Sequence, residues 1–269
     1  MKTNALISLC LLAFSAAVFA PSCKTQYDIM LESNDVQGKY KMAFELFEAG
    51  KYAKAASMFE SLKLAVKGTL QDDTVQYYAA YSNYRYGDMT LAEQGFESFV
   101  ATFPRSPFTP KARFQYLDCL YSSTYRYELD QTPTYKALSA INEYLVDYPD
   151  NEYVSQCNQM IEDLEERLDR KDYESAKLYY TIEDYKAAHY ALKLVLKENP
   201  ENLYREDIMY YTALAAFDYA LNSIQEKQRE RFVTFQDDYI SFISEYPESR
   251  YRKTLDGLAS RAQKFLNRN

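Results

Sequence analysis

The 269-residue sequence is poor in the residues that build turns and reactive sites: it holds 6 glycines, 8 prolines, a single histidine and no tryptophan. Glycine and proline together make up about 5% of the chain, whereas ordinary proteins carry roughly 12%. Strands, tight turns and phosphate-binding loops consume these residues, so their shortage favours helices joined by short connections. The lone histidine, His189, has no second histidine to join it, and we expect no enzyme activity, no cofactor and no metal site.

Positive charge is also in short supply. Lys and Arg number 31 against 39 Asp and Glu, and the net charge of −8 argues against a general nucleic-acid-binding protein. With 26% charged and 47% hydrophobic residues, the chain is too apolar for disorder and too polar for a multi-pass membrane protein. Aromatic residues are plentiful, with 28 tyrosines and 15 phenylalanines, and the fold has to explain this load.

The first 22 residues have the pattern of an export signal. Lys2 precedes an uncharged apolar run, Ala5–Phe19, which is long for a signal core and too short to span a membrane. The segment Ala20–Cys23 then resembles a bacterial lipobox, in which small residues precede a cysteine that becomes lipidated. We therefore expect a lipoprotein-type signal peptide over residues 1–22, lipidation of Cys23 and a lipidated tether over residues 23–37. The alternative is a plain secreted protein with an incidental cysteine.

Two further cysteines, Cys119 and Cys157, lie inside apolar helical patterns, where cysteine acts as a small hydrophobe. Export would place them in an oxidising compartment, and the sequence leaves open whether they pair. No Cys-x-x-Cys motif or histidine–cysteine cluster indicates a metal.

An internal repeat indicates the fold. At a constant offset of 37 residues, the segment Tyr40–Phe59 matches Tyr77–Phe96 at aromatic, alanine and glycine positions. In each segment a helical pattern ends at a glycine, Gly50 or Gly87, and a second amphipathic pattern starts two or three residues later. This arrangement is typical of a helical hairpin with glycine as the C-terminal stop.

The later second helices are found from the prolines that close them. Twelve residues before each proline stand small or aromatic residues, and the apolar positions that follow share one helical stripe. The stretch from Val154 to Ile182 lacks glycine and proline and predicts one long or bent helix. Five hairpins and a C-terminal helix then give an all-α, right-handed tetratricopeptide-repeat (TPR) solenoid over residues 38–269. The closing prolines are Pro104, Pro149, Pro200 and Pro247.

A lipoprotein signal followed by five such repeats resembles the BamD family of outer-membrane protein assembly lipoproteins. The stretches that carry the resemblance are Phe47–Phe59, Phe99–Ser106, Leu129–Ala137 and Glu174–Tyr180. The resemblance implies a lipid-anchored protein of a Gram-negative outer membrane that faces the periplasm and belongs to the machinery (the BAM complex) that inserts β-barrel proteins. It also implies partners: the periplasmic domains of the central barrel subunit, other assembly lipoproteins and unfolded β-barrel substrates.

Two other functions suit the same fold: a TPR lipoprotein that coordinates envelope growth or division, and a helical nutrient-binding lipoprotein. The absence of tryptophan weakens a sugar-binding function, because carbohydrate platforms favour tryptophan faces, although tyrosine can substitute. Adjacent acidic pairs such as Asp237 and Asp238 diverge on a helix and are interpreted as solvated surface.

Two surfaces are candidate binding sites. The first helices of stacked hairpins line a concave side, so an aromatic stripe there predicts a groove for an extended peptide, with Arg85 available for a terminal carboxylate. The alternative is that these rings pack between adjacent repeats. The groove candidates are Tyr40, Phe44, Phe47, Tyr77, Tyr81, Tyr84 and Arg85.

The second candidate surface is the basic C-terminal end. Residues 250–269 hold six Lys or Arg residues against one Asp, a local charge of +5, which would steer the end toward an acidic partner. A polar cap of the solenoid is the alternative. From the family resemblance, we expect the last repeats to dock the barrel subunit through Tyr204, Arg205, Arg250, Arg252 and Lys253.

Overall fold

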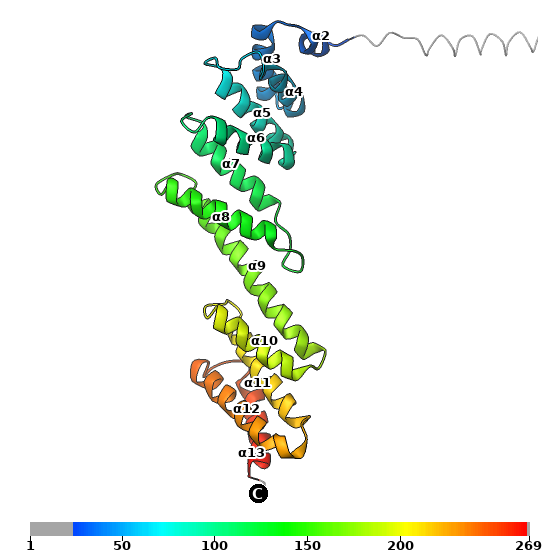
Figure 1. The fold of residues 1–269 in the computed structure, drawn as a ribbon, viewed down its shortest axis with the longest axis vertical. Coiled ribbons are helices and arrows are strands. Elements are labelled where there is room, and N and C mark those ends of the chain that lie inside the picture. Colours follow the sequence, from blue (N-terminus) through cyan, green and yellow to red (C-terminus); the bar gives the residue numbers. More distant parts are fainter. Residues whose placement is uncertain (1–23, 268–269) are drawn as a thin grey trace, which may run out of the picture. The chain divides into compact units, whose positions relative to one another are not determined.

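The computed structural model describes residues 24–267, which fold into twelve α-helices and no strand (Figure 1). The all-α prediction is confirmed. The chain divides into two compact units, residues 1–119 and 120–269. The predicted signal peptide and Cys23 lie outside the described residues.

The first unit is built from two hairpins with a short helix before them and one helix after them. Helix α3 pairs with α4, α4 packs on α5, and α5 pairs with α6. The helices are α2 (Gln26–Glu32), α3 (Val36–Glu48), α4 (Tyr52–Leu62), α5 (Asp72–Tyr86), α6 (Met89–Thr102) and α7 (Thr109–Ser122), of which α7 belongs to this unit up to Cys119.

Both hairpin turns of the first unit use the predicted glycines. Gly50 (φ 71°) and Gly87 (φ 92°) adopt the left-handed conformation that ends a helix and that other residues adopt only with strain. The Gly87 amide donates to the Tyr84 carbonyl at 3.1 Å, so the turn satisfies a carbonyl that the helix end would leave free.

Apolar side chains fill the space between these helices in two clusters. One lies between α3, α4 and α5 around Phe59, and the other lies between α5, α6 and α7 around Phe96. Phe59 and Phe96, which the 37-residue offset had matched, are both fully buried. Each hairpin therefore buries its apolar face against the next one, as a repeat protein requires.

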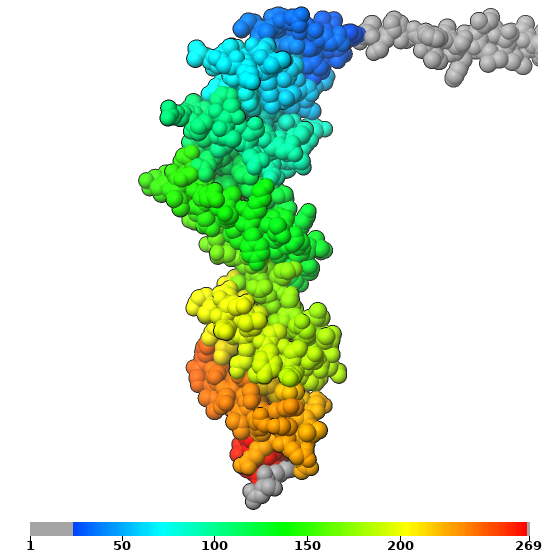
Figure 2. Space-filling view, viewed as in Figure 1, coloured from blue at the N-terminus to red at the C-terminus, as the bar shows by residue number. Residues whose placement is uncertain are grey.

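Helix α2 corrects the prediction of a polar tether over residues 23–37. Thr25 accepts a hydrogen bond from the Asp28 amide, and Asp28 accepts one from the Thr25 amide, which completes a capping box. Tyr27, Met30 and Leu31 pack against the first cluster. This apolar stripe spans a single helical turn, too short to show periodicity in the sequence. Figure 2 shows the surface of α2 joined to that of α3 at the blue end of the chain.

The second unit begins with one helix packed on a long one and ends with a hairpin covered by the C-terminal helix. Helix α8 packs on α9, α9 pairs with α10, α11 with α12, and α13 packs on α12 and α11. The predicted long helix is confirmed, because α9 has 28 residues. The helices are α8 (Thr132–Asp147), α9 (Val154–Thr181), α10 (Tyr185–Glu198), α11 (Arg205–Leu221), α12 (Gln225–Glu245) and α13 (Arg252–Leu266).

The proline-closed helices are also as predicted. Helices α6, α8, α10 and α12 each end two residues before their proline, because the residue before proline disfavours the helical conformation. The side chain twelve residues before each proline is fully buried, which confirms the shared register of these four helices. The four side chains are Ala92, Ala137, Ala188 and Phe235.

The units thus share one plan, the repeated helical hairpin of TPR proteins. None of the helices within residues 24–267 is long and apolar enough to cross a membrane.

Candidate peptide-binding and docking surfaces

The predicted aromatic stripe of the first unit lies at the contact between hairpins. The Phe44 ring on α3 meets the Tyr78 ring on α5, with centroids 4.8 Å apart, and Phe47 meets Tyr81 at 5.4 Å. The Tyr40 ring lies tilted beside the Phe44 ring, with centroids 5.0 Å apart. These side chains are half-buried. Packing between the hairpins therefore covers part of each ring, and the rest of each ring remains accessible.

Tyr77 is not available to a groove in this structure. It is 2% exposed, its ring stacks on Phe108 at 4.6 Å, and its hydroxyl donates to the Gln115 side chain at 3.0 Å. The sequence suggested otherwise because Tyr77 shares a helical stripe with Tyr81, but the segment leading into α7 covers one end of that stripe.

Two cations lie over the accessible part of the stripe. The Arg85 guanidinium is 4.7 Å from the Tyr52 ring centroid and 5.8 Å from the Tyr81 centroid, and Arg85 is itself exposed. The Lys111 ammonium lies 5.3 Å from the Tyr81 centroid. Cations over ring faces are held in place by the ring quadrupole while their outer side stays in water. Tyr81 is therefore the centre of an accessible patch with aromatic and cationic character.

Tyrosine hydroxyls bonded to aspartates connect every second helix, a feature that sequence reasoning missed. Tyr84 on α5 donates to Asp118 on α7, and Tyr180 on α9 donates to Asp218 on α11 at 2.8 Å. Burial, together with the bonded carboxylate, raises the pKa of both Tyr84 and Tyr180 well above the usual value. Tyr84 and Tyr180 each stand three residues before a left-handed turn residue, and this spacing was a signal that could have been found.

The predicted docking residues of the second unit are held by partners within the unit. Arg205 forms a two-point ion pair with Glu245, with nitrogen–oxygen distances of 2.5 and 3.0 Å. The hydrogen bond from Arg205 lowers the pKa of Glu245 against the opposing effect of burial. The Tyr204 ring stacks on Tyr173 at 5.2 Å. Arg205 and Tyr204 thus tie α11 to α12 and to α9 as well as facing solvent.

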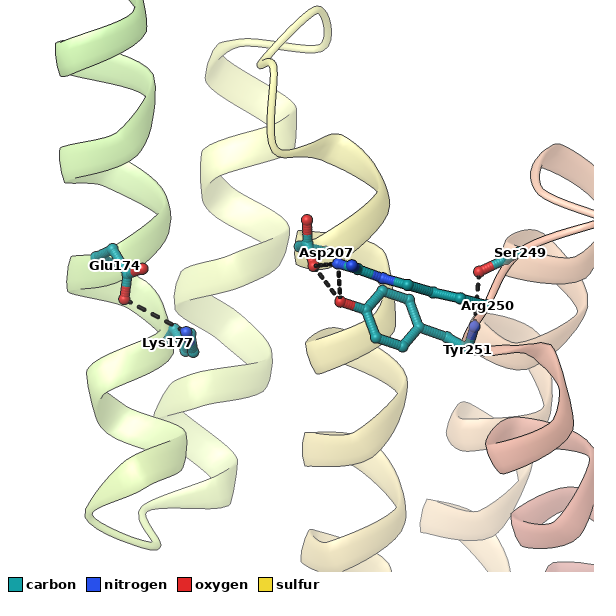
Figure 3. Close-up of polar contacts among 6 residues, drawn as sticks. All are labelled: Glu174, Lys177, Asp207, Ser249, Arg250 and Tyr251. Atoms are coloured by element: carbon teal, nitrogen blue, oxygen red, sulfur yellow. Dashed lines mark hydrogen bonds and ion pairs between the residues drawn. The ribbon is translucent and has the colours of Figure 1, made fainter.

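Figure 3 shows the start of α13 against α11. Tyr251 donates its hydroxyl hydrogen to Asp207 and stacks on Tyr210, and the Arg250 guanidinium lies 3.2 Å from the same carboxylate. Burial and the bond to Asp207 raise the pKa of Tyr251 to about 12. On α9, Lys177 pairs with Glu174 at 3.4 Å. The surface is therefore a set of tyrosines interleaved with paired charges.

The remaining predicted docking residues, Arg252 and Lys253, differ in whether nearby acceptors bind their charged groups. Arg252 donates to the Pro247 carbonyl at 2.8 Å and lies 3.6 Å from Asp256. Lys253 is exposed. Arg250 and Arg252 thus share their charge with nearby carboxylates, and Lys253 presents the more open charge of the three.

His189 and Asp238 form a buried polar contact between α10 and α12. The His189 Nε2 atom lies 2.7 Å from Asp238 Oδ2, and the Lys193 ammonium lies 2.8 Å from Oδ1. Burial alone would raise the pKa of Asp238, but the hydrogen bonds from His189 and Lys193 together hold it below the usual value. The interpretation of Asp238 as solvated surface is wrong, because α12 turns Asp238 toward α10 and leaves Asp237 outside.

Cys119 and Cys157 are free and buried in the structure. Burial raises the pKa of both thiols, that of Cys119 to about 12, so neither is a reactive thiolate near neutral pH. Within residues 24–267, no group of three His, Cys, Asp or Glu side chains is placed to hold a metal ion.

These features define a helical-repeat scaffold whose surfaces are suited to peptides and proteins. The model of the family described as YfiO, outer membrane lipoprotein, matches residues 32–202. The chain belongs to this family, which associates it with the outer membrane.

A search of curated proteins gives no match. Among solved structures, a thermophilic TPR protein of Thermus thermophilus is similar at 17% identity and a TM-score of 0.33. That alignment covers 86% of this chain and 98% of the other.

Proposed function

We propose that the protein is a lipid-anchored, periplasm-facing component of the BAM complex, the machinery that inserts β-barrel proteins into the outer membrane. The observation that carries this proposal is the family match over residues 32–202, which includes both hairpins of the first unit and the start of the second. In this role the first unit receives unfolded barrel segments and the second docks the central barrel subunit.

The role is tested by extracting the tagged full chain from its native membrane and identifying what copurifies. We expect a large β-barrel subunit, and depletion of the chain should reduce folded barrel proteins in the outer membrane. Copurification with division or cell-wall proteins, with barrel assembly intact after depletion, would instead support envelope coordination.

The anchor is tested separately through Cys23, with the barrel subunit depleted so that a second attachment does not hold the protein. The lipid and a bound membrane partner are two separate attachments, so the partner has to be removed before the effect of the lipid can be measured. We expect the Cys23→Ser variant to leave the membrane fraction under these conditions. Wild-type fractionation of this variant would contradict lipid anchoring at Cys23.

The aromatic face of α3 and α5 suits an extended, aromatic-rich peptide. Tyrosine tolerates water when the face is empty and offers apolar contact when it is filled, while Arg85 can pair with a terminal carboxylate. A synthetic aromatic peptide with a free C-terminus should bind more tightly than its amidated form, by about 1 kcal/mol or more.

The difference between free and amidated peptide should vanish in the Arg85→Ala variant and persist in the matched control Arg105→Ala, another exposed arginine of this unit. An unchanged preference in Arg85→Ala would move the carboxylate site elsewhere.

A further inference from the structure

Helix α9 extends past the helix that covers it. With 28 residues it is much longer than α8, which has 16, and α10, which has 14. The segment leading into α8 reaches α9 at Lys171, whose ammonium donates to the Leu129 carbonyl at 2.8 Å and the Tyr127 carbonyl at 3.1 Å. Beyond Lys171, α9 continues to Thr181 along α10 and α11 (Figure 1).

An apolar hollow of about 500 Å³ opens between this extension and α10. Its walls include Leu178, Ile182 and Leu194, which are 57%, 63% and 50% exposed. Aliphatic side chains that share one hollow and remain half in water favour burial against another molecule. In repeat proteins the side of a hairpin is normally covered by a neighbouring hairpin, and here α8 covers only the earlier part of α9.

This hollow adjoins an acidic one of about 450 Å³, since Asp172 and Asn199 line both. Glu162, Glu165 and Glu201 line the acidic part. Within the described residues none of these three glutamates forms an ion pair. Burial, with Asp169 and Glu198 nearby, raises the pKa of Asp172, which is the response of a carboxylate among like charges.

We propose that these two adjoining hollows, together the α9 groove, follow α9 from Glu162 to Ile182 and bind an amphipathic helix of a partner protein. The partner helix carries aliphatic residues along the half that meets Leu178 and Leu194, and Lys or Arg residues along the half that faces the glutamates. The segment from Glu162 to Ile182 spans about 30 Å of helix, room for a partner helix of similar length. The acidic residues select a basic partner by charge complementarity.

The chain's own basic helix is not the occupant. Leu255 and Ala262 of α13 are fully buried against α11 and α12, so its apolar face is already used. This inference does not depend on the proposed function, because any partner with such a helix satisfies it.

The probe is a synthetic 20-residue helical peptide, leucine-rich in one half and lysine-rich in the other, made in both orders along the chain. Binding to the detergent-extracted full-length protein is measured by fluorescence anisotropy. Leu194→Asp and Glu165→Lys should each weaken binding of the better peptide at least tenfold. The matched exposed controls Leu91→Asp and Glu97→Lys on α6 should stay within twofold. Equal binding to groove and control variants would overturn the proposal.

A photoreactive amino acid at Leu178 or Leu194 then tests the site in cells, with Leu91 as the control position. The proposal expects a cross-link to a segment of another protein that has the apolar and basic pattern of the probe. Cross-links only to lipid or to a second copy of this chain, or no cross-link above the control, would overturn it.

Discussion

In the first unit, the Phe47 ring on α3 packs on the Tyr81 ring on α5, whereas in the second unit the Tyr180 ring on α9 packs on Tyr211 of α11 and its hydroxyl also donates to Asp218. Phe47 and Tyr180 occupy equivalent places, three residues before a left-handed turn. The same repeat position therefore serves either apolar or hydrogen-bonded contact. A ring contact is indifferent to pH, but a bonded carboxylate depends on the charge state of its neighbours.

The difference extends to what each unit offers a partner. The first unit presents rings with cations above them, which suits an apolar peptide with a negative end. The second presents paired charges, open glutamates and an uncovered apolar groove, which suits a structured and charged partner. The two units are therefore candidates for different classes of ligand.

The largest expected effect is on the ring packing of the first unit. Tyr77→Ala removes a buried ring and should lower the free energy of unfolding by about 3–5 kcal/mol. Urea denaturation measures it, with Tyr86→Ala on the same helix, 63% exposed, as the control that changes little. A loss below about 1 kcal/mol would mean that the ring contacts do not hold this unit together.

The buried polar contact of the second unit should be worth somewhat less. Asp238→Asn weakens the bonds to His189 and Lys193 and should cost about 2 kcal/mol at pH 7. Because the folded-state pKa of Asp238 is lowered, its contribution is present above about pH 4 and is lost as pH falls through the folded pKa. The gap in unfolding free energy between the two proteins should be constant from pH 7 to about pH 4 and narrow below it. A gap that stays constant down to pH 3 would assign the cost to packing.

Much of this architecture was predictable because it depends on local patterns. The 37-residue offset and the closing prolines depend on residues that set their own backbone, such as Gly87 and Pro200. The long-range hydrogen-bond partners of side chains such as Tyr84 and His189 were not predictable in the same way. Asp118 lies 34 residues from Tyr84, and Asp238 lies 49 residues from His189, so only the packing of whole helices brings them together.

The exposed apolar groove also escaped prediction. Helical periodicity places Leu178 and Leu194 on apolar stripes, and a stripe alone indicates core. Whether a neighbour covers it depends on where α8 begins relative to α9, which no local pattern records.

Tyr180→Phe tests the hydroxyl contact of the second unit and should cost about 1 kcal/mol of unfolding free energy. The exposed neighbour Tyr179→Phe is the matched control. Because the folded-state pKa of Tyr180 is raised, its contribution is complete below about pH 10 and is lost as pH rises through the folded pKa. An equal effect of both substitutions would mean that the hydroxyl bond adds nothing to the contact between α9 and α11.

The smallest effect concerns the turn that ends α9. Glu183 adopts a left-handed conformation (φ 64°), where the first unit has Gly50 and Gly87. Left-handed backbone costs a non-glycine residue about 1–2 kcal/mol, while glycine gives up about 0.5–1 kcal/mol through the freedom of the unfolded chain. Glu183→Gly should therefore raise the unfolding free energy by about 0.5–1 kcal/mol, and the converse Gly87→Ala should lower it by a similar or larger amount. Urea denaturation of both variants measures the pair. A Glu183→Gly variant less stable than wild type would mean that the glutamate side chain stabilises this turn, and α9 would then end by different means from α3 and α5.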